Sequence, residues 1–193
     1  MSGALPTTPK FSSLKFRTKN FNLKSESVSG RLQVRAIGGQ RFEFTAVYPP
    51  MTRADFAPLF AFAMKQRGMA DTFTVTPTKI SNNSAAASGT VTTSGSTASG
   101  ATATTITGLT GTLKAGDFFK FATHSKLYMI TADRAGNGSL AFEPPLIVTV
   151  STGSGITYTA VPITVRFNGD VQEYSLASDD HLIRYELDLI EAV

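Results

Sequence analysis

Apolar and polar residues alternate from residue 41 to residue 48, and a second alternating run covers residues 72–76. A period of two places one face of a strand on a core and leaves the other face more polar. Pro49 and Pro50 end the first strand, because proline has no N–H to donate to a sheet. The segment between the two runs holds an amphipathic helix, around which we expect the other strands to pack.

The predicted helix follows Thr52, whose hydroxyl can accept a hydrogen bond from the helix N-terminus while Asp55 reaches back, as in a capping box. Its expected core face comprises Phe56, Leu59, Phe60, Ala63 and Met64. Pro58 is unfavourable deep inside a helix, so either the first turn is separate or the regular helix starts at Ala57 with Pro58 in its first turn. Gly68 is the expected left-handed stop.

Two further turns predict β-hairpins. Gly38 and Gly39 separate an alternating run from the strand at residue 41, and the favoured type I′ turn needs positive φ at both central residues. Residues 168–170, Asn-Gly-Asp, form a similar signal between the runs 161–167 and 171–176. We therefore predict that the strands on either side of each turn pair with each other.

Residues 81–113 carry no charge and consist mostly of Ser, Thr, Ala and Gly. Their β-branched residues predict short strands in an exposed part of a β insertion, as opposed to a flexible linker. Short strands with tight turns follow and predict a small β-barrel or β-sandwich. The regular strand at 183–189 needs a sheet to join. We predict a mainly β chain with two domains: a β-sandwich with one flanking helix formed by 1–80 and 161–193, and an inserted β domain at 81–160.

The composition excludes several classes of site. The chain has 193 residues and no cysteine, so disulfides and thiolate metal sites are excluded. We find no apolar run long enough to span a membrane and no secretory signal, and expect synthesis in a cytosol. The net charge is +4, and the bases gather before residue 45, where the acids are Glu26 and Glu43. This pattern fits either a surface facing nucleic acid or an acidic partner, or ordinary solvated strand faces.

Candidate chemistry is sparse. His124 reads as a surface residue in a polar turn, and His181 follows Asp179 and Asp180. Three adjacent residues rarely converge on one ion, so we interpret residues 179–181 as a solvated turn and not as a metal site. We find no nucleophile elbow, calcium loop, phosphate loop or dinucleotide fingerprint. We therefore predict no enzyme, and no catalytic, cofactor-binding or metal-binding residues.

Two stretches resemble a known family. The turn, short helix and strand of YPPMTRADFAPLFAFAMKQRGMADTFTV resemble tail-tip proteins of tailed bacteriophages, especially the distal tail proteins. The segments LKAGDFFKFATHSKLYMITAD and GSLAFEPPL resemble the β module inserted in some of these proteins. The resemblance implies a structural virion protein whose first domain is a β-sandwich with a flanking helix. It also implies assembly into a ring, commonly a hexamer, at the end of the tail tube.

The leading hypothesis is a tail-tip ring subunit that connects the tail tube to tip, hub or baseplate components. DNA passing through the ring lumen would then give the basic residues a use. A tail-tube or tube-initiating protein is the first alternative, and a glycan-binding adhesion module is the second. An adhesion module would expose an aromatic platform, whereas six aromatic residues of the insertion read mostly as core: Phe118, Phe119, Phe121, Tyr128, Phe142 and Tyr158.

Overall fold

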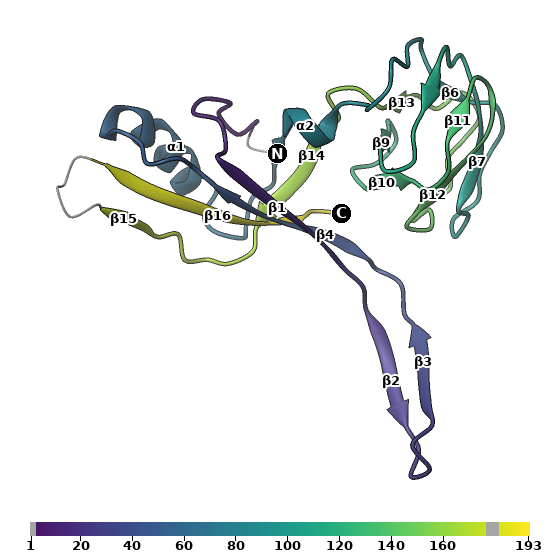
Figure 1. The fold of residues 1–193 in the computed structure, drawn as a ribbon, viewed down its shortest axis with the longest axis horizontal. Helices are drawn as coiled ribbons and strands as arrows, with labels where there is room; N and C mark the ends of the chain where they lie inside the picture. The colour runs from purple at the N-terminus through teal and green to yellow at the C-terminus, as the bar shows by residue number, and fades with distance from the viewer. Residues whose placement is uncertain (1–2, 177–181) are drawn as a thin grey trace. The chain divides into compact units, whose positions relative to one another are not determined.

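The computed structural model describes residues 3–176 and 182–193, and it is mainly β, as the sequence predicts (Figure 1). The chain divides into two compact units. The first, the sheet unit, comprises Met1–Phe73 and Val165–Glu191. The second, the barrel unit, comprises Thr74–Thr164 and Ala192–Val193.

The sheet unit is built on a six-stranded sheet and one helix, α1 (Arg53–Lys65). Five strands follow the order β1-β4-β16-β14-β5, and β15 pairs with β16 off this path. The strands are β1 (Ser13–Lys19), β4 (Arg41–Val47), β5 (Phe73–Val75), β14 (Ile163–Phe167), β15 (Tyr174–Leu176) and β16 (Ile183–Glu191). A separate two-stranded ladder is formed by β2 (Asn22–Glu26) and β3 (Leu32–Ala36). The strands predicted at residues 41–48, 72–76 and 183–189 are confirmed.

The start of α1 confirms one prediction and corrects another. Thr52 Oγ1 accepts a hydrogen bond from the Asp55 N–H at 3.4 Å and donates one to Asp55 Oδ2 at 2.8 Å, so the predicted cap is present. The prediction for Pro58 is wrong, because α1 begins at Arg53 and continues through the proline. Proline removes one bond to the carbonyl of Ala54. Ala54 is exposed, so solvent can satisfy that carbonyl.

The buried face of α1 is narrower than predicted. Phe56, Leu59 and Ala63 are buried, and Phe60 is half-buried. Met64 was expected in the core and is 62% exposed, so that part of the prediction is wrong. An apolar residue at the edge of a helical stripe is buried only where a neighbouring element covers it, which the spacing along the helix does not determine.

The predicted hairpin at Gly38 and Gly39 is wrong. Both glycines have positive φ, of 87° and 75°, but they lie where one ladder passes into another. β4 pairs with β1, and β3 pairs with β2. The chain reverses earlier, where the Gly30 N–H donates to the Ser27 carbonyl at 2.8 Å. The upstream run Asn22–Glu26 matches β3 residue for residue and so competes successfully for it.

The predicted hairpin at residues 168–170 is also wrong. Within the described residues, β14 and β15 each pair with β16 and not with each other. The nine-residue β16 is long enough to take both strands in succession along one edge. The segment between β14 and β15 is anchored to the residues that follow α1. The Asp170 carboxylate accepts a hydrogen bond from the Met69 N–H at 3.0 Å.

The barrel unit contains a six-stranded sheet in the order β13-β9-β10-β12-β7-β6. Its first and last strands meet again at a bridge between Thr92 and Gly155, and the Ile156 N–H donates to the Val91 carbonyl at 2.9 Å, so the sheet closes on itself. β8 and β11 form a short additional ladder. The elements are α2 (Thr78–Ser81), β6 (Thr92–Thr93), β7 (Ala103–Thr107), β8 (Thr112–Leu113), β9 (Phe118–Phe121), β10 (Leu127–Ile130), β11 (Arg134–Ala135), β12 (Gly138–Glu143) and β13 (Ile156–Thr157).

The uncharged stretch 81–113 forms short strands, as predicted, but it is not simply an exposed part of the insertion. Val91, Ile106, Leu109 and Leu113 are buried in the barrel core. Sparse apolar residues in Ser- and Thr-rich strands suffice here, because each strand needs to supply only one or two side chains to a small closed barrel.

Candidate assembly surface

The most exposed feature of the sheet unit is the hairpin formed by β2 and β3, which we define as residues 21–37. It continues from the ends of β1 and β4 (Figure 1), and every residue in it is exposed. An isolated two-stranded hairpin has no core of its own and is marginally stable in water. The hairpin therefore lacks the packing that stabilises the rest of the chain.

Large apolar side chains are concentrated on this hairpin. Their exposed fractions run from 42% to 111%. The residues are Phe21, Leu23, Val28, Leu32, Val34 and Ile37. Single exposed apolar residues are ordinary on protein surfaces, but a group of this size on one projecting element indicates a contact surface. The sequence did not show this surface, because β3 alternates like a half-buried strand, and only its pairing with β2 places charged residues on both faces of the hairpin.

Two basic residues of β1 are engaged with polar side chains of β4. Lys19 Nζ lies 3.0 Å from Glu43 Oε1 on β4. Arg17 Nη2 donates to Thr45 Oγ1 at 3.1 Å, and Thr45 Oγ1 donates to Asp188 Oδ1 on β16 at 2.7 Å. Lys19 and Arg17, two of the predicted surface cations, are thus engaged within the sheet. Arg17 is linked through Thr45 to Asp188, which is far away in the sequence. The polar face of this sheet carries both signs of charge.

The other end of the sheet carries an aromatic cluster around β15. The Tyr174 ring lies 4.8 Å from Phe56 and 5.2 Å from Phe60 of α1, measured between ring centroids. The Tyr185 ring of β16 lies 5.4 Å from Phe56 in an edge-on arrangement. Tyr174 is nevertheless 46% exposed, so one side of its ring faces solvent. This cluster holds β15 in place and presents part of its apolar surface outward.

Two tyrosines at this end of the sheet, Tyr48 and Tyr185 of the cluster, are buried. The Tyr48 and Tyr185 rings stack with centroids 6.0 Å apart, and neither hydroxyl has a hydrogen-bond partner among the described residues. Burial raises the pKa of both phenols, and Tyr185 adds to the rise at Tyr48. The two phenols therefore remain neutral and act as packing groups at the end of the sheet.

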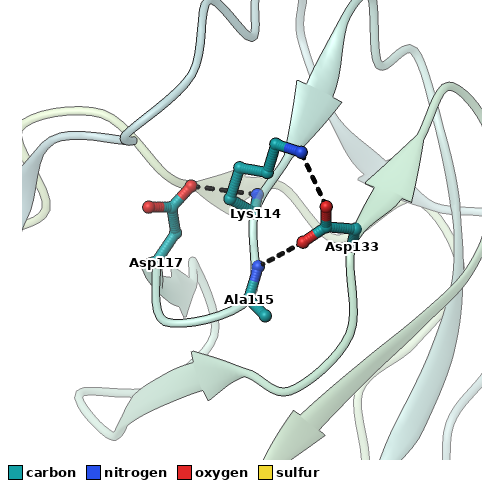
Figure 2. A network of polar contacts seen from close by, with 4 residues as sticks. All are labelled: Lys114, Ala115, Asp117 and Asp133. Carbon is teal, nitrogen blue, oxygen red and sulfur yellow. Dashed lines mark hydrogen bonds and ion pairs between the residues drawn. The ribbon is translucent and has the colours of Figure 1, made fainter.

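The barrel unit is organised by a network of carboxylates at the turn before β9 (Figure 2). Asp133 accepts hydrogen bonds from Lys114 Nζ at 2.7 Å and from the Ala115 N–H at 2.9 Å. Asp117 accepts from the Lys114 N–H at 3.1 Å and from the Ser84 N–H at 2.9 Å. Two carboxylates thus hold four donors, three of them backbone N–H groups. This network shapes the turn before β9.

Comparison with protein families gives a match in the barrel unit. Residues 81–161 match the family model described as distal tail protein pb9, B domain. This segment is similar to a distal tail protein B domain, and we call it the B domain. The match confirms the predicted resemblance to distal tail proteins of tailed bacteriophages and supports a structural role in a phage tail. No curated protein matched the chain.

Aromatic residues of the B domain point inward, as the sequence indicated. The six residues considered for an aromatic platform are all buried. A shallow depression of about 280 Å³ lies on the B domain surface and is lined by small residues: Gly95, Ser96, Thr97, Ala98, Ala103, Thr104, Thr105 and Ser139. Its lining contains neither an aromatic ring nor a charge, the groups that commonly hold sugars or anions. The depression does not favour the adhesion alternative.

His124 lies in a turn of the B domain, as predicted, but its side chain is not a bland surface group. Its Nε2 lies 2.8 Å from the hydroxyl of Tyr128, and its Nδ1 lies 3.0 Å from Thr123 Oγ1. Desolvation lowers the pKa of His124, and the nearby positive charge of Lys120 lowers it further. A neutral imidazole therefore orients the buried Tyr128. The sequence could not indicate this contact, because it depends on the turn folding back over β10.

Asp179, Asp180 and His181 lie outside the described residues. Neither helix in residues 3–176 and 182–193 has the length and apolar character needed to cross a membrane.

Replacing Asp133 with asparagine is expected to lower the stability of the B domain in a pH-dependent way. The hydrogen bond from Lys114, then that from Ala115, holds the pKa of Asp133 below its ordinary value of 3.8. A lowered folded-state pKa contributes stability above the ordinary value, and this contribution is lost as the pH falls through the lowered value. Thermal unfolding of both proteins should therefore differ at neutral pH and converge in acid. A difference that persists unchanged in acid would contradict this assignment.

Proposed function

We propose that this chain is the subunit of a closed ring, a hexamer, at the distal end of a phage tail, where it connects the tail tube to tip or baseplate components. The observation that supports this proposal most directly is the B domain match over residues 81–161. The exposed apolar hairpin on the remaining part of the chain is the kind of surface that a ring subunit needs.

We also propose that residues 81–160 are an insertion into a ring domain made of residues 1–80 and 161–193. The Val161 N–H donates to the Ser81 carbonyl at 2.9 Å, so the two ends of the proposed insertion lie side by side. Domains inserted at such adjoining points leave the host fold continuous. In this arrangement the ring domain supplies the contacts between subunits, and the B domain is not needed to form the ring.

Neighbouring tube, tip and hub proteins are the proposed partners above and below the ring, and DNA is expected to cross its lumen during ejection. Arg17 and Lys19 of β1 are engaged with Thr45 and Glu43. Exposed cations for these contacts are Lys24, Arg31 and Arg35 of the hairpin and Lys15 of β1. Basic charges on such a surface speed association with acidic partners. This electrostatic effect weakens as the salt concentration rises.

Light scattering coupled to size exclusion, at several protein concentrations, tests the ring. We expect a species of six times the subunit mass of 20.5 kDa, with closed rings of one size in negative-stain images. Open tubes of variable length would instead support the tail-tube alternative. A monomer at every concentration would contradict a self-assembling ring.

A further inference from the structure

The hairpin has two different faces, which its register defines. Leu23 lies opposite Arg35, and Lys24 lies opposite Val34. By the period of two, Phe21, Leu23, Arg35 and Ile37 share one face, which we call the Leu23 face. The Ile37 N–H donates to the Phe21 carbonyl at 3.0 Å, so the ladder extends to this pair.

The Leu23 face is apolar and basic. Its three large apolar side chains are joined by Arg35, and Lys19 Nζ lies 6.0 Å from the centre of the Phe21 ring. The opposite face has two large exposed apolar side chains, Leu32 and Val34, beside one base and one acid, Lys24 and Glu26. The Leu23 face has three large apolar side chains and only basic charge, so it is the face that a partner would cover, and that partner should be apolar with negative charge.

The sheet unit presents such a surface at residues 169–176. This segment contains two acids, Asp170 and Glu173, and no base. Three of its side chains are large, apolar and exposed: Val171, Tyr174 and Leu176. Met69 is 39% exposed and lies next to this segment, because its backbone N–H donates a hydrogen bond to the Asp170 carboxylate. We call these residues the β15 patch.

The hairpin and the β15 patch lie at opposite ends of one sheet. β4 runs antiparallel to β16 with Glu43 opposite Ile190 and Val47 opposite Glu186. The hairpin therefore leaves the sheet beside the C-terminal end of β16, whereas β15 pairs with its N-terminal end, at Ile183–Tyr185. Figure 1 shows this separation within the sheet unit. The hairpin of one copy cannot reach the patch of the same copy.

We infer that the Leu23 face of the hairpin docks on the β15 patch of a second copy of this chain. The two surfaces differ, so the contact is heterologous and repeats from copy to copy, which generates a ring if the rotation closes. The inference rests on the proposed ring and specifies which surfaces form it. Apolar contact supplies the attraction, and Arg35 with the two acids sets the orientation.

Cysteine cross-linking in the full chain tests the contact directly, because the protein has no cysteine of its own. The variant carrying Leu23→Cys and Leu176→Cys is oxidised at the assembly concentration and run on a non-reducing gel. We expect a ladder of cross-linked copies. The matched control carries Val34→Cys and Leu176→Cys. Leu23, Val34 and Leu176 are 59%, 55% and 56% exposed, so the two pairs differ in the hairpin face and not in accessibility.

Mixing two defective variants distinguishes a heterologous contact from a symmetric one. Leu23→Asp disables the hairpin, and Leu176→Asp disables the patch, so each variant alone should remain monomeric. Each copy in an equal mixture keeps one intact surface. The mixture should therefore form a species of two copies and nothing larger, as measured by light scattering.

Three outcomes would overturn the inference. Rings formed by both aspartate variants would overturn it while leaving the proposed ring intact. Equal cross-linking of the two cysteine pairs would do the same, because it would show no preference for the Leu23 face. Absence of a cross-linked ladder in the Leu23→Cys and Leu176→Cys variant, together with a wild-type protein that does not assemble, would overturn the inference and the proposed ring together.

Discussion

A variant in which residues 20–40 are replaced by a two-residue Asn-Gly turn is expected to fold as a monomer and to form no rings. The pairing of β1 with β4 extends to Lys19 opposite Arg41, so a tight turn can close the two strands there. Residues 21–39 are exposed, so their removal eliminates little buried surface. We expect the free energy of unfolding of the monomer to change by less than about 1 kcal/mol.

The measurements are the mass in solution and the thermal unfolding curve. A matched deletion removes residues 82–160 and joins Ser81 to Val161 with a short Gly-Ser linker, which their 2.9 Å hydrogen bond allows. Rings are expected to survive this second deletion. Rings formed without the hairpin would show that the exposed apolar residues serve another purpose. Loss of rings in both variants would place the assembly surface in the B domain or across both parts of the chain.

Phe119→Ala is expected to destabilise the B domain by about 3–5 kcal/mol. Phe119 has no exposed surface and contacts three other rings. Its ring centroid lies 5.3 Å from Phe121, 5.6 Å from Tyr128 and 5.5 Å from Phe142. The substitution removes apolar burial and leaves a cavity that a closed barrel can only partly fill. The melting temperature of this domain should fall by more than about 10 °C.

Far-UV circular dichroism of the full chain is the suitable measurement, because the protein has no tryptophan. Val148→Ala is the control in the same domain. Val148 is 51% exposed, so its truncation should change the free energy of unfolding by less than about 0.5 kcal/mol. Equal losses in the two variants would mean that the aromatic cluster does not carry the stability of the barrel.

Much of the local structure follows from residues near one another in the chain. The alternation at 41–48 and 183–189 predicts β4 and β16, and the Thr52 cap predicts the start of α1. These features depend on side-chain period and on hydrogen bonds that span three or four residues. The resemblance to distal tail proteins also comes from short motifs, and the family match of the B domain confirms it.

The candidate assembly surface could not be predicted in the same way. Alternation in β3 reports only that one face differs from the other, and an unpartnered hairpin shows the same pattern as a buried strand. The charge run before residue 45 was visible, but the hydrogen bonds that link Arg17 through Thr45 to Asp188 were not. Asp188 lies 143 residues from Thr45 in sequence, and only the pairing of β4 with β16 brings them within 2.7 Å.

The sequence by itself determined that this chain is mainly β, which segments form its principal strands, where α1 is capped, and that its composition excludes thiolate metal sites and disulfides. The tertiary structure alone decided which strands pair, that Met64 faces solvent, that residues 81–113 contribute to a core, and that the hairpin is exposed. Local patterns set the period and ends of an element through contacts between near neighbours. Pairing and burial depend on which distant segments compete for the same edge, as when β2 displaces β4 as the partner of β3 and β16 takes both β14 and β15.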